Sequence, residues 1–127
     1  MIIEDYVSFE TAKLLKEKGF DEYCGYYSSD GEYWGYCTYN HKGKDYISAP
    51  TLQMAMKWLR EVHKLYVEVV PNPLNFEHQD IQDGWGCEVI HLSDLSYDGN
   101  YEFFQKKYST YEEACEAAIK YCLENLI

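Results

Sequence analysis

The chain has 127 residues, of which 46% are hydrophobic and 26% charged, and this size and balance fit one folded domain over residues 1–127. Its 22 acidic and 11 basic residues give a net charge of −11, which repels nucleic-acid phosphates and anionic membranes, so direct nucleic-acid binding is not expected. No apolar run approaches the roughly 20 residues that span a bilayer, and residues 1–10 lack the features of a secretory signal. We therefore expect a soluble, cytoplasmic protein without a membrane partner.

The five cysteines also favour a reducing compartment. Their number is odd and their spacing shows no disulfide framework: Cys24, Cys37, Cys87, Cys115 and Cys122. Each lies in an apolar or aromatic run, where a free thiol behaves as a small buried hydrophobe. We expect reduced thiols that pack in the core.

A first helix is predicted between Ser8, a good N-cap residue, and Gly19, which follows a lysine-rich turn and suits a left-handed helix end. Phe20, just beyond the end, could fold back on Leu15. The inward-facing residues of this helix would be Ala12, Leu14 and Leu15.

Residues 22–39 hold two aromatic-rich runs that flank Asp30-Gly31, a strong signal for a β-hairpin. The runs place rings on both faces of two strands: Tyr23, Tyr26, Tyr27, Tyr33, Trp34, Tyr36 and Tyr39. Gly25 and Gly35 interrupt these strands, which indicates room for a neighbouring ring or a β-bulge. A second turn is predicted at 40–44, and residues 45–47 could add a short third strand.

The clearest predicted element is a second helix, with Pro50 in a permitted first-turn position. Its inward residues recur at intervals of three and four: Leu52, Ala55, Met56, Leu59, Val62 and His63. Met54 and Trp58 widen this face, so we expect burial against a sheet and against another helix or subunit.

Three further strands are predicted at residues 65–70, 85–92 and 101–106. Pro71 and Pro73 end the first of them, because proline cannot donate to a strand ladder. A long irregular segment at 72–84 follows, and a turn through 97–100 joins the last two strands. The three strands would form a meander.

A last helix opens with a capping box, formed either by Ser109 with Glu112 or by Thr110 with Glu113. Its apolar stripe comprises Ala114, Cys115, Ala118, Ile119, Cys122, Leu123 and Leu126. The predicted order is α-β-β-(β)-α-β-β-β-α. We expect an α+β fold in which helices two and three cover the antiparallel three-stranded meander, while the aromatic hairpin extends it or forms a second small sheet.

No motif for catalysis or metal binding emerges. The histidines at 41, 63, 78 and 91 are scattered, no CxxC or HExxH occurs, and only His78 with Glu77 and Asp80 could meet a cation. Cys87 and His91 would share a strand face but lie about 13 Å apart, too far for a thiol dyad. We assign no catalytic residue, no metal and no cofactor.

The aromatic hairpin points instead to an interaction surface, because rings on both faces leave one face outside the core. Tyrosine and tryptophan are enriched at the energetic centres of protein interfaces. We therefore expect protein–protein contacts, with a symmetric homodimer as their simplest form. The candidate binding residues are Tyr26, Trp34, Tyr36 and Trp58.

Two alternatives remain open. An acidic protein can mimic DNA and occupy a nucleic-acid-binding enzyme, although the acids are dispersed here, as on the last helix at Glu112, Glu113, Glu116 and Glu124. A pocket between sheet and helix could instead bind a small molecule through polar groups of Tyr66, Glu68, Glu88 or His91.

Three stretches carry a resemblance: VSFETAKLLKEKGFDE at 7–22, ISAPTLQMAMKWLREVH at 47–63 and YSTYEEACEAAIKYCLENL at 108–126. They resemble small uncharacterised accessory proteins encoded by phages and integrated mobile elements of gut bacteria. The resemblance covers the three predicted helices. It implies an accessory protein that binds a host or phage protein rather than an enzyme, and it carries no catalytic residue across.

Overall fold

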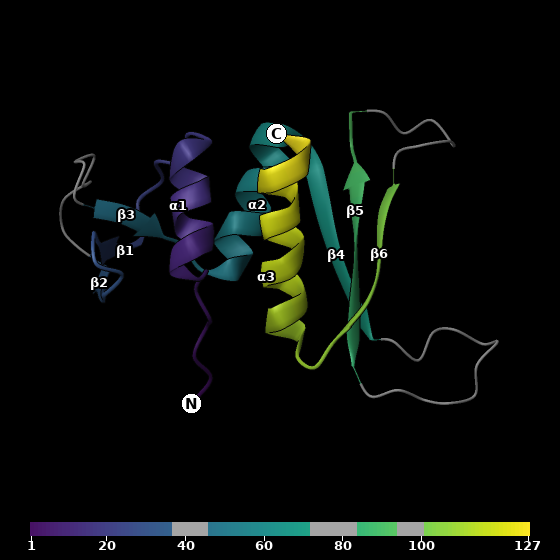
Figure 1. Ribbon diagram of the computed structural model, residues 1–127, viewed down its shortest axis with the longest axis horizontal. Helices are drawn as coiled ribbons and strands as arrows, with labels where there is room; N and C mark the ends of the chain where they lie inside the picture. Colours follow the sequence, from purple (N-terminus) through teal and green to yellow (C-terminus); the bar gives the residue numbers. More distant parts are fainter. Residues whose placement is uncertain (37–45, 72–83, 94–100) are drawn as a thin grey trace.

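The computed structural model describes residues 1–36, 46–71, 84–93 and 101–127, and it confirms the α+β class and the predicted element order. Three helices form a layer with a three-stranded antiparallel sheet on either side (Figure 1). The small sheet has the order β2-β1-β3, and the large sheet has the order β4-β5-β6. The predicted hairpin therefore belongs to a separate sheet and does not extend the meander.

The small sheet consists of β1 (Gly25–Ser28), β2 (Tyr33–Tyr36) and β3 (Tyr46–Ala49). The large sheet consists of β4 (Leu65–Pro71), β5 (Trp85–His91) and β6 (Tyr101–Tyr108). The helices are α1 (Phe9–Glu17), α2 (Leu52–His63) and α3 (Tyr111–Tyr121), and α3 continues into a π-helical turn, η2 (Cys122–Leu126). In Figure 1, α1 lies beside the small sheet and α3 beside the large one.

Helix α1 begins and ends as predicted. The Ser8 side chain accepts a hydrogen bond from the Thr11 amide at 3.2 Å, which satisfies one of the free amides of the first turn. At the other end Gly19 takes a left-handed φ of 93°, and the Phe20 amide donates to the Leu15 carbonyl at 3.0 Å. This Schellman arrangement ends the helix and turns Phe20 back toward the core.

Helix α2 begins at Leu52, two residues after Pro50, which the sequence had suggested for its first turn. Thr51 is the N-cap and accepts from the Met54 amide at 3.1 Å, so Pro50 precedes the helix instead of occupying its first turn. The Pro50 carbonyl accepts from the Val7 amide at 2.9 Å and ties the N-terminal segment to this corner. Val62, expected on the inner face, is 56% exposed, so the buried face does not extend through the last turn.

Helix α3 and η2 form the centre of the core, and the predicted apolar stripe is confirmed except at Leu126, which is only partly buried. The fully buried residues are small or medium in size: Ala114, Cys115, Ala118, Ile119, Cys122 and Leu123. Small side chains let the helix lie close to its neighbours, and α3 contacts α1, α2 and all three strands of the large sheet. None of the described helices is long and apolar enough to cross a membrane.

Candidate interaction surface

The inner face of the small sheet is anchored to the N-terminal segment and α1 by aromatic contacts. Tyr27 is 6% exposed, its hydroxyl donates to the Val7 carbonyl at 2.6 Å, and its ring packs edge-on against Phe9 at 5.4 Å. Burial raises the pKa of Tyr27 to about 12, so this phenol remains a hydrogen-bond donor at neutral pH. Tyr33 stacks on Tyr6 with ring centroids 4.0 Å apart. These contacts fix the position of the sheet.

A β-bulge lies at Trp34, and the side chain of this residue is largely exposed. Tyr26 is the Cα partner of Gly35, but the next residue, Tyr27, is the partner of Tyr33, so Trp34 is the extra residue on β2. Gly35 takes a left-handed φ of 72°, a conformation that glycine adopts without strain. A bulge re-aims the side chains around it, and the Trp34 side chain is 60% exposed.

Gly25 makes room for a neighbouring ring, which is the second role predicted for the two strand glycines. A Cβ atom at this position would lie 2.5 Å from the Tyr33 hydroxyl oxygen and 2.9 Å from a ring carbon of the same residue. The absence of a side chain therefore makes room for the Tyr33 ring against Tyr6. The sequence predicted a bulge or a close approach at the two glycines, and the structure has one of each.

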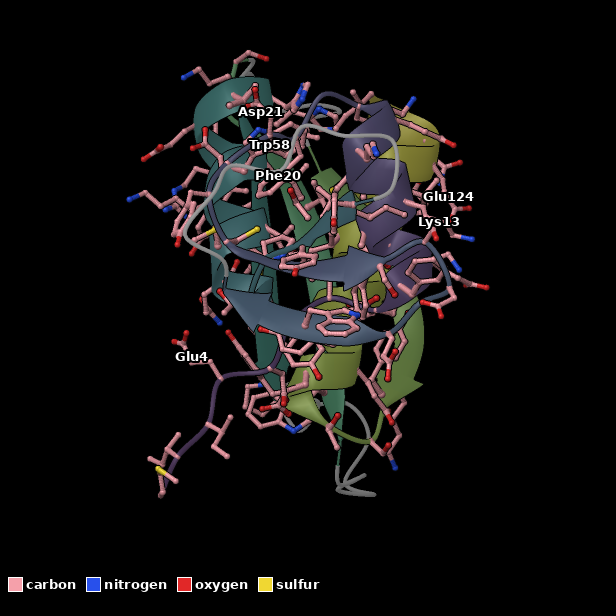
Figure 2. The ribbon with its side chains drawn as sticks, turned by 90° about the vertical axis from the view of Figure 1, so that its left-hand side faces the viewer. Glu4, Lys13, Phe20, Asp21, Trp58 and Glu124 are labelled. Carbon is pink, nitrogen blue, oxygen red and sulfur yellow. The ribbon has the colours of Figure 1, made fainter. Side chains whose placement is uncertain are left out.

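The outer face of the small sheet carries a second aromatic pair. Tyr26 is the Cα partner of Ser48, and Ser28 is the partner of Tyr46, so these four residues share a face. The rings of Tyr26 and Tyr46 meet edge-on at 5.1 Å. No described helix lies on this face, and Figure 2 looks onto it. We call Tyr26, Ser28, Tyr46 and Ser48, together with the exposed Trp34 of the adjacent strand β2, the outer aromatic face.

The four predicted binding residues do not form one surface. Tyr26 is half-buried and Trp34 is exposed, and both belong to the outer aromatic face. Tyr36 lies in β2 as the Cα partner of Gly25. Trp58 is only 8% exposed, and its ring packs against Phe20 at 5.4 Å (Figure 2), so it belongs to the core and not to an accessible surface.

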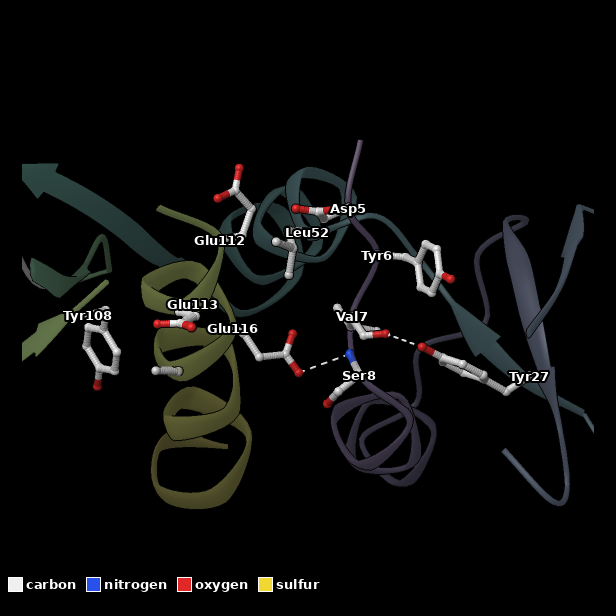
Figure 3. A pocket seen from close by; sticks show the side chains of 11 residues that line it. Asp5, Tyr6, Val7, Ser8, Tyr27, Leu52, Tyr108, Glu112, Glu113 and Glu116 are labelled. Atoms are coloured by element: carbon white, nitrogen blue, oxygen red, sulfur yellow. Dashed lines mark hydrogen bonds between the residues drawn. The ribbon is translucent and has the colours of Figure 1, made fainter. Parts of the chain in front are cut away.

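A groove of about 650 Å³ lies where the N-terminal segment passes the start of α3 (Figure 3). Its lining includes four carboxylates, which are those of Asp5, Glu112, Glu113 and Glu116, and the rings of Tyr6, Tyr27 and Tyr108. Sequence reasoning missed the groove, because its lining comes from five separate stretches of the chain and no local motif brings them together.

Two of the groove carboxylates, those of Glu113 and Glu116, accept hydrogen bonds from other parts of the chain. Oε1 of Glu116 accepts hydrogen bonds from the Ser8 amide at 3.0 Å (Figure 3) and from the buried Thr11 hydroxyl at 2.6 Å. Oε2 of Glu113 accepts from the Ser109 amide at 3.2 Å and from its hydroxyl at 2.7 Å, which lowers the pKa of Glu113. Thr110 in turn accepts from the Glu113 amide, so the second predicted capping pair is the one used.

The residues considered for a pocket on the large sheet are only partly brought together. Tyr66, Glu68 and Glu88 share the face that points away from the helices, because Glu68 and Glu88 are Cα partners and Tyr66 lies two positions from Glu68. His91 is the partner of Leu65 and therefore lies on the opposite face. A hydrogen bond between the side chains of Glu68 and Glu88, together with burial, raises the pKa of Glu88 to about 7.

The described cysteines, Cys24, Cys87, Cys115 and Cys122, are free and buried. Burial raises the pKa of three of them, Cys24, Cys87 and Cys115, to about 11, so these thiols are protonated and poor nucleophiles at neutral pH.

Within the described parts of the chain, no three acidic, histidine or cysteine side chains gather as metal ligands would. Cys37, Tyr39, His41 and the 77–80 segment lie outside the described residues. Comparison of the chain with protein-family models, with curated proteins and with solved structures finds no match.

Proposed function

We propose that this protein is a non-enzymatic binding module, a phage or mobile-element accessory protein that acts through protein–protein contacts made by the outer aromatic face. The observation that carries the proposal is the 60% exposure of Trp34 at a bulge in a sheet that is anchored to the N-terminal segment and α1. Tryptophan and tyrosine supply large contact areas with few rotatable bonds, and they dominate the energetic centres of interfaces.

The surroundings of Trp34 suit such a role. The Tyr26–Tyr46 pair extends the apolar area across the neighbouring strands, and Ser28 and Ser48 supply hydroxyl groups beside it. Because the Tyr27 hydrogen bond and the Tyr6–Tyr33 stack already fix the sheet, little conformational entropy is lost when a partner binds. A host or phage protein is the expected partner, and a second copy of the chain is the simplest one.

The alternatives are supported less well. Three of the four carboxylates of α3 and η2 considered for DNA mimicry have partners inside the chain: Glu113 caps the helix, Glu116 accepts from the Ser8 amide at the start of α1, and Glu124 lies 4.0 Å from Lys120. Carboxylates that imitate phosphates would have to be free of such partners in order to meet a DNA-binding protein. We therefore propose neither DNA mimicry nor a small-molecule site as the function.

The proposal is tested by affinity capture from a lysate of a gut bacterium, with the tagged protein and its Trp34→Ala variant as baits. Val62→Ala is the control, because it removes an exposed apolar side chain from α2, outside the outer aromatic face. We expect a partner that the wild type and Val62→Ala retain and that Trp34→Ala loses.

Sedimentation velocity of the same three proteins tests the homodimer. If self-association and captured partners are alike for all three proteins, the outer aromatic face is not the binding surface.

A further inference from the structure

The large sheet has one face that no described helix covers. Leu65, Val67, Cys87 and Val89 are buried toward α2 and α3. The alternate residues of β4 and β5 must therefore point the other way. Figure 1 shows the helices on one side of this sheet only. The helix-free face comprises Tyr66, Glu68, Val70, Glu88 and Ile90.

The centre of this face is a pair of carboxylates in an apolar setting. Glu68 and Glu88 are directly opposite each other, with Tyr66 and Ile90 as the neighbouring cross-strand pair and Val70 on the other side. Like charges placed opposite each other on adjacent strands destabilise a sheet. The pair relieves this repulsion when a proton is shared in the hydrogen bond between the two side chains, and a cationic partner would relieve it when both carboxylates are charged. Neither carboxylate forms an ion pair with any described lysine, arginine or histidine.

On the neighbouring strand β6, the residues directly across from Glu88 and Ile90 are Phe103 and Tyr101, and neither of these residues is basic. Two carboxylates are also too few for a calcium site, which takes six to eight oxygen ligands. What complements two adjacent carboxylates best is a planar group with several parallel N–H donors, and the arginine guanidinium is that group.

We propose that the helix-free face of the β4-β5-β6 sheet binds a protein segment that inserts an arginine between Glu68 and Glu88. The apolar side chains on either side of that arginine pack on Tyr66, Val70 and Ile90. Charge complementarity selects this occupant: a second copy of the chain, with its net charge of −11, would bring two further carboxylates against the first two. This inference is independent of the outer aromatic face, because the two faces lie at opposite ends of the molecule (Figure 1).

The probe is the peptide acetyl-Val-Arg-Val-amide, with acetyl-Val-Gln-Val-amide as its uncharged match, added to ¹⁵N-labelled protein and followed by NMR. We expect the arginine peptide alone to shift the amide signals of residues 66–70 and 86–90. Removing one charge-assisted hydrogen-bond partner should weaken binding about tenfold, so Glu68→Gln and Glu88→Gln should each raise the dissociation constant by that factor. Glu112→Gln removes a charge from the groove instead, and it should leave the dissociation constant of the arginine peptide unchanged.

Three outcomes would overturn the proposal. Equal shifts with the two peptides would show that the guanidinium is not recognised. Shifts confined to Asp5 and Glu112 would place the cation in the groove. Shifts of the β4 and β5 amides that depend on protein concentration without peptide would make a second copy the occupant. The variants Glu68→Gln and Glu88→Gln should fold, because each substitution removes a charge repulsion. The comparison of the two peptides needs only the wild-type protein, so it tests the proposal even without the variants.

Discussion

Thr11 and Glu116 show how a single polar contact joins two helices. The Thr11 side chain is fully buried, and its hydroxyl donates to Glu116 at 2.6 Å across 105 residues of sequence. Glu116 also accepts from the Ser8 amide, at the N-terminus of α1, where a negative charge is favourable. The sequence marked Ser8 as a cap, but it could not reveal Glu116 as its neighbour, because that contact depends on how α1 and α3 pack.

Replacing Glu116 by alanine should therefore destabilise the protein. The substitution leaves a buried hydroxyl and a helix-end amide without their acceptor, and losses of this kind cost about 2 kcal/mol. Urea unfolding measures the change in the free energy of unfolding. Glu112→Ala is the control, because Glu112 is exposed and makes no hydrogen bond or ion pair within the described residues. Equal effects of the two substitutions would contradict this role for Glu116.

The Glu68–Glu88 pair predicts a pH dependence of stability. The folded pKa of Glu88 is raised to about 7, above the value near 4.3 of an unfolded glutamate, so between these values the folded protein binds more protons. Stability should therefore fall as pH rises from about 4.5 to 7. Because the side chain of Glu88 is only partly buried, solvent screens much of the effect, and we expect a change below about 1 kcal/mol.

Thermal unfolding of Glu88→Gln and wild type from pH 4.5 to 8 measures this effect. The variant should match the wild type at pH 4.5 and be the more stable protein at pH 8. Glu112→Gln carries the same change in net charge and should show no such divergence. A constant difference between Glu88→Gln and wild type across the range would exclude a shared proton.

At the scale of elements, local sequence signals predicted helix ends and the hairpin well. Ser8, Gly19 and the Thr110–Glu113 pair act as caps because capping depends on residues a few positions apart. The start of α2 was misplaced because Pro50 and Thr51 are both acceptable near a helix start, and only the hydrogen bond of the Thr51 side chain decides between them. The small sheet was uncertain because its strands have only four residues each.

The bulge on β2 can be tested through its glycine. Gly35→Ala should destabilise the protein by about 1 kcal/mol, because an L-residue resists the left-handed φ of 72° even though open space surrounds the position. Trp34→Ala, one residue earlier, should cost less, because most of that side chain is already in solvent. Chemical denaturation compares the two. A larger loss for Trp34→Ala would mean that the tryptophan supports the fold rather than a contact.

At the scale of the whole molecule, the sequence identified the core stripe of α3 and the covered meander, because both follow from periodicity. It did not identify the placement of the two sheets on opposite sides of the helices, the groove, or the burial of Trp58 against Phe20. These features depend on which amphipathic faces meet. A tryptophan on a wide apolar helix face can equally pack inside one chain or against a partner, and its sequence position does not distinguish the two.

The measurement that tests the central claim most directly is hydrogen–deuterium exchange of the protein alone and with its captured partner. Binding through the outer aromatic face should slow exchange of amides in β2 and β3, the two edge strands of the small sheet, and leave β4 and β5 unchanged. The Trp34→Ala variant should show no such protection under the same conditions. Protection that spares the small sheet and appears elsewhere would contradict the proposed function.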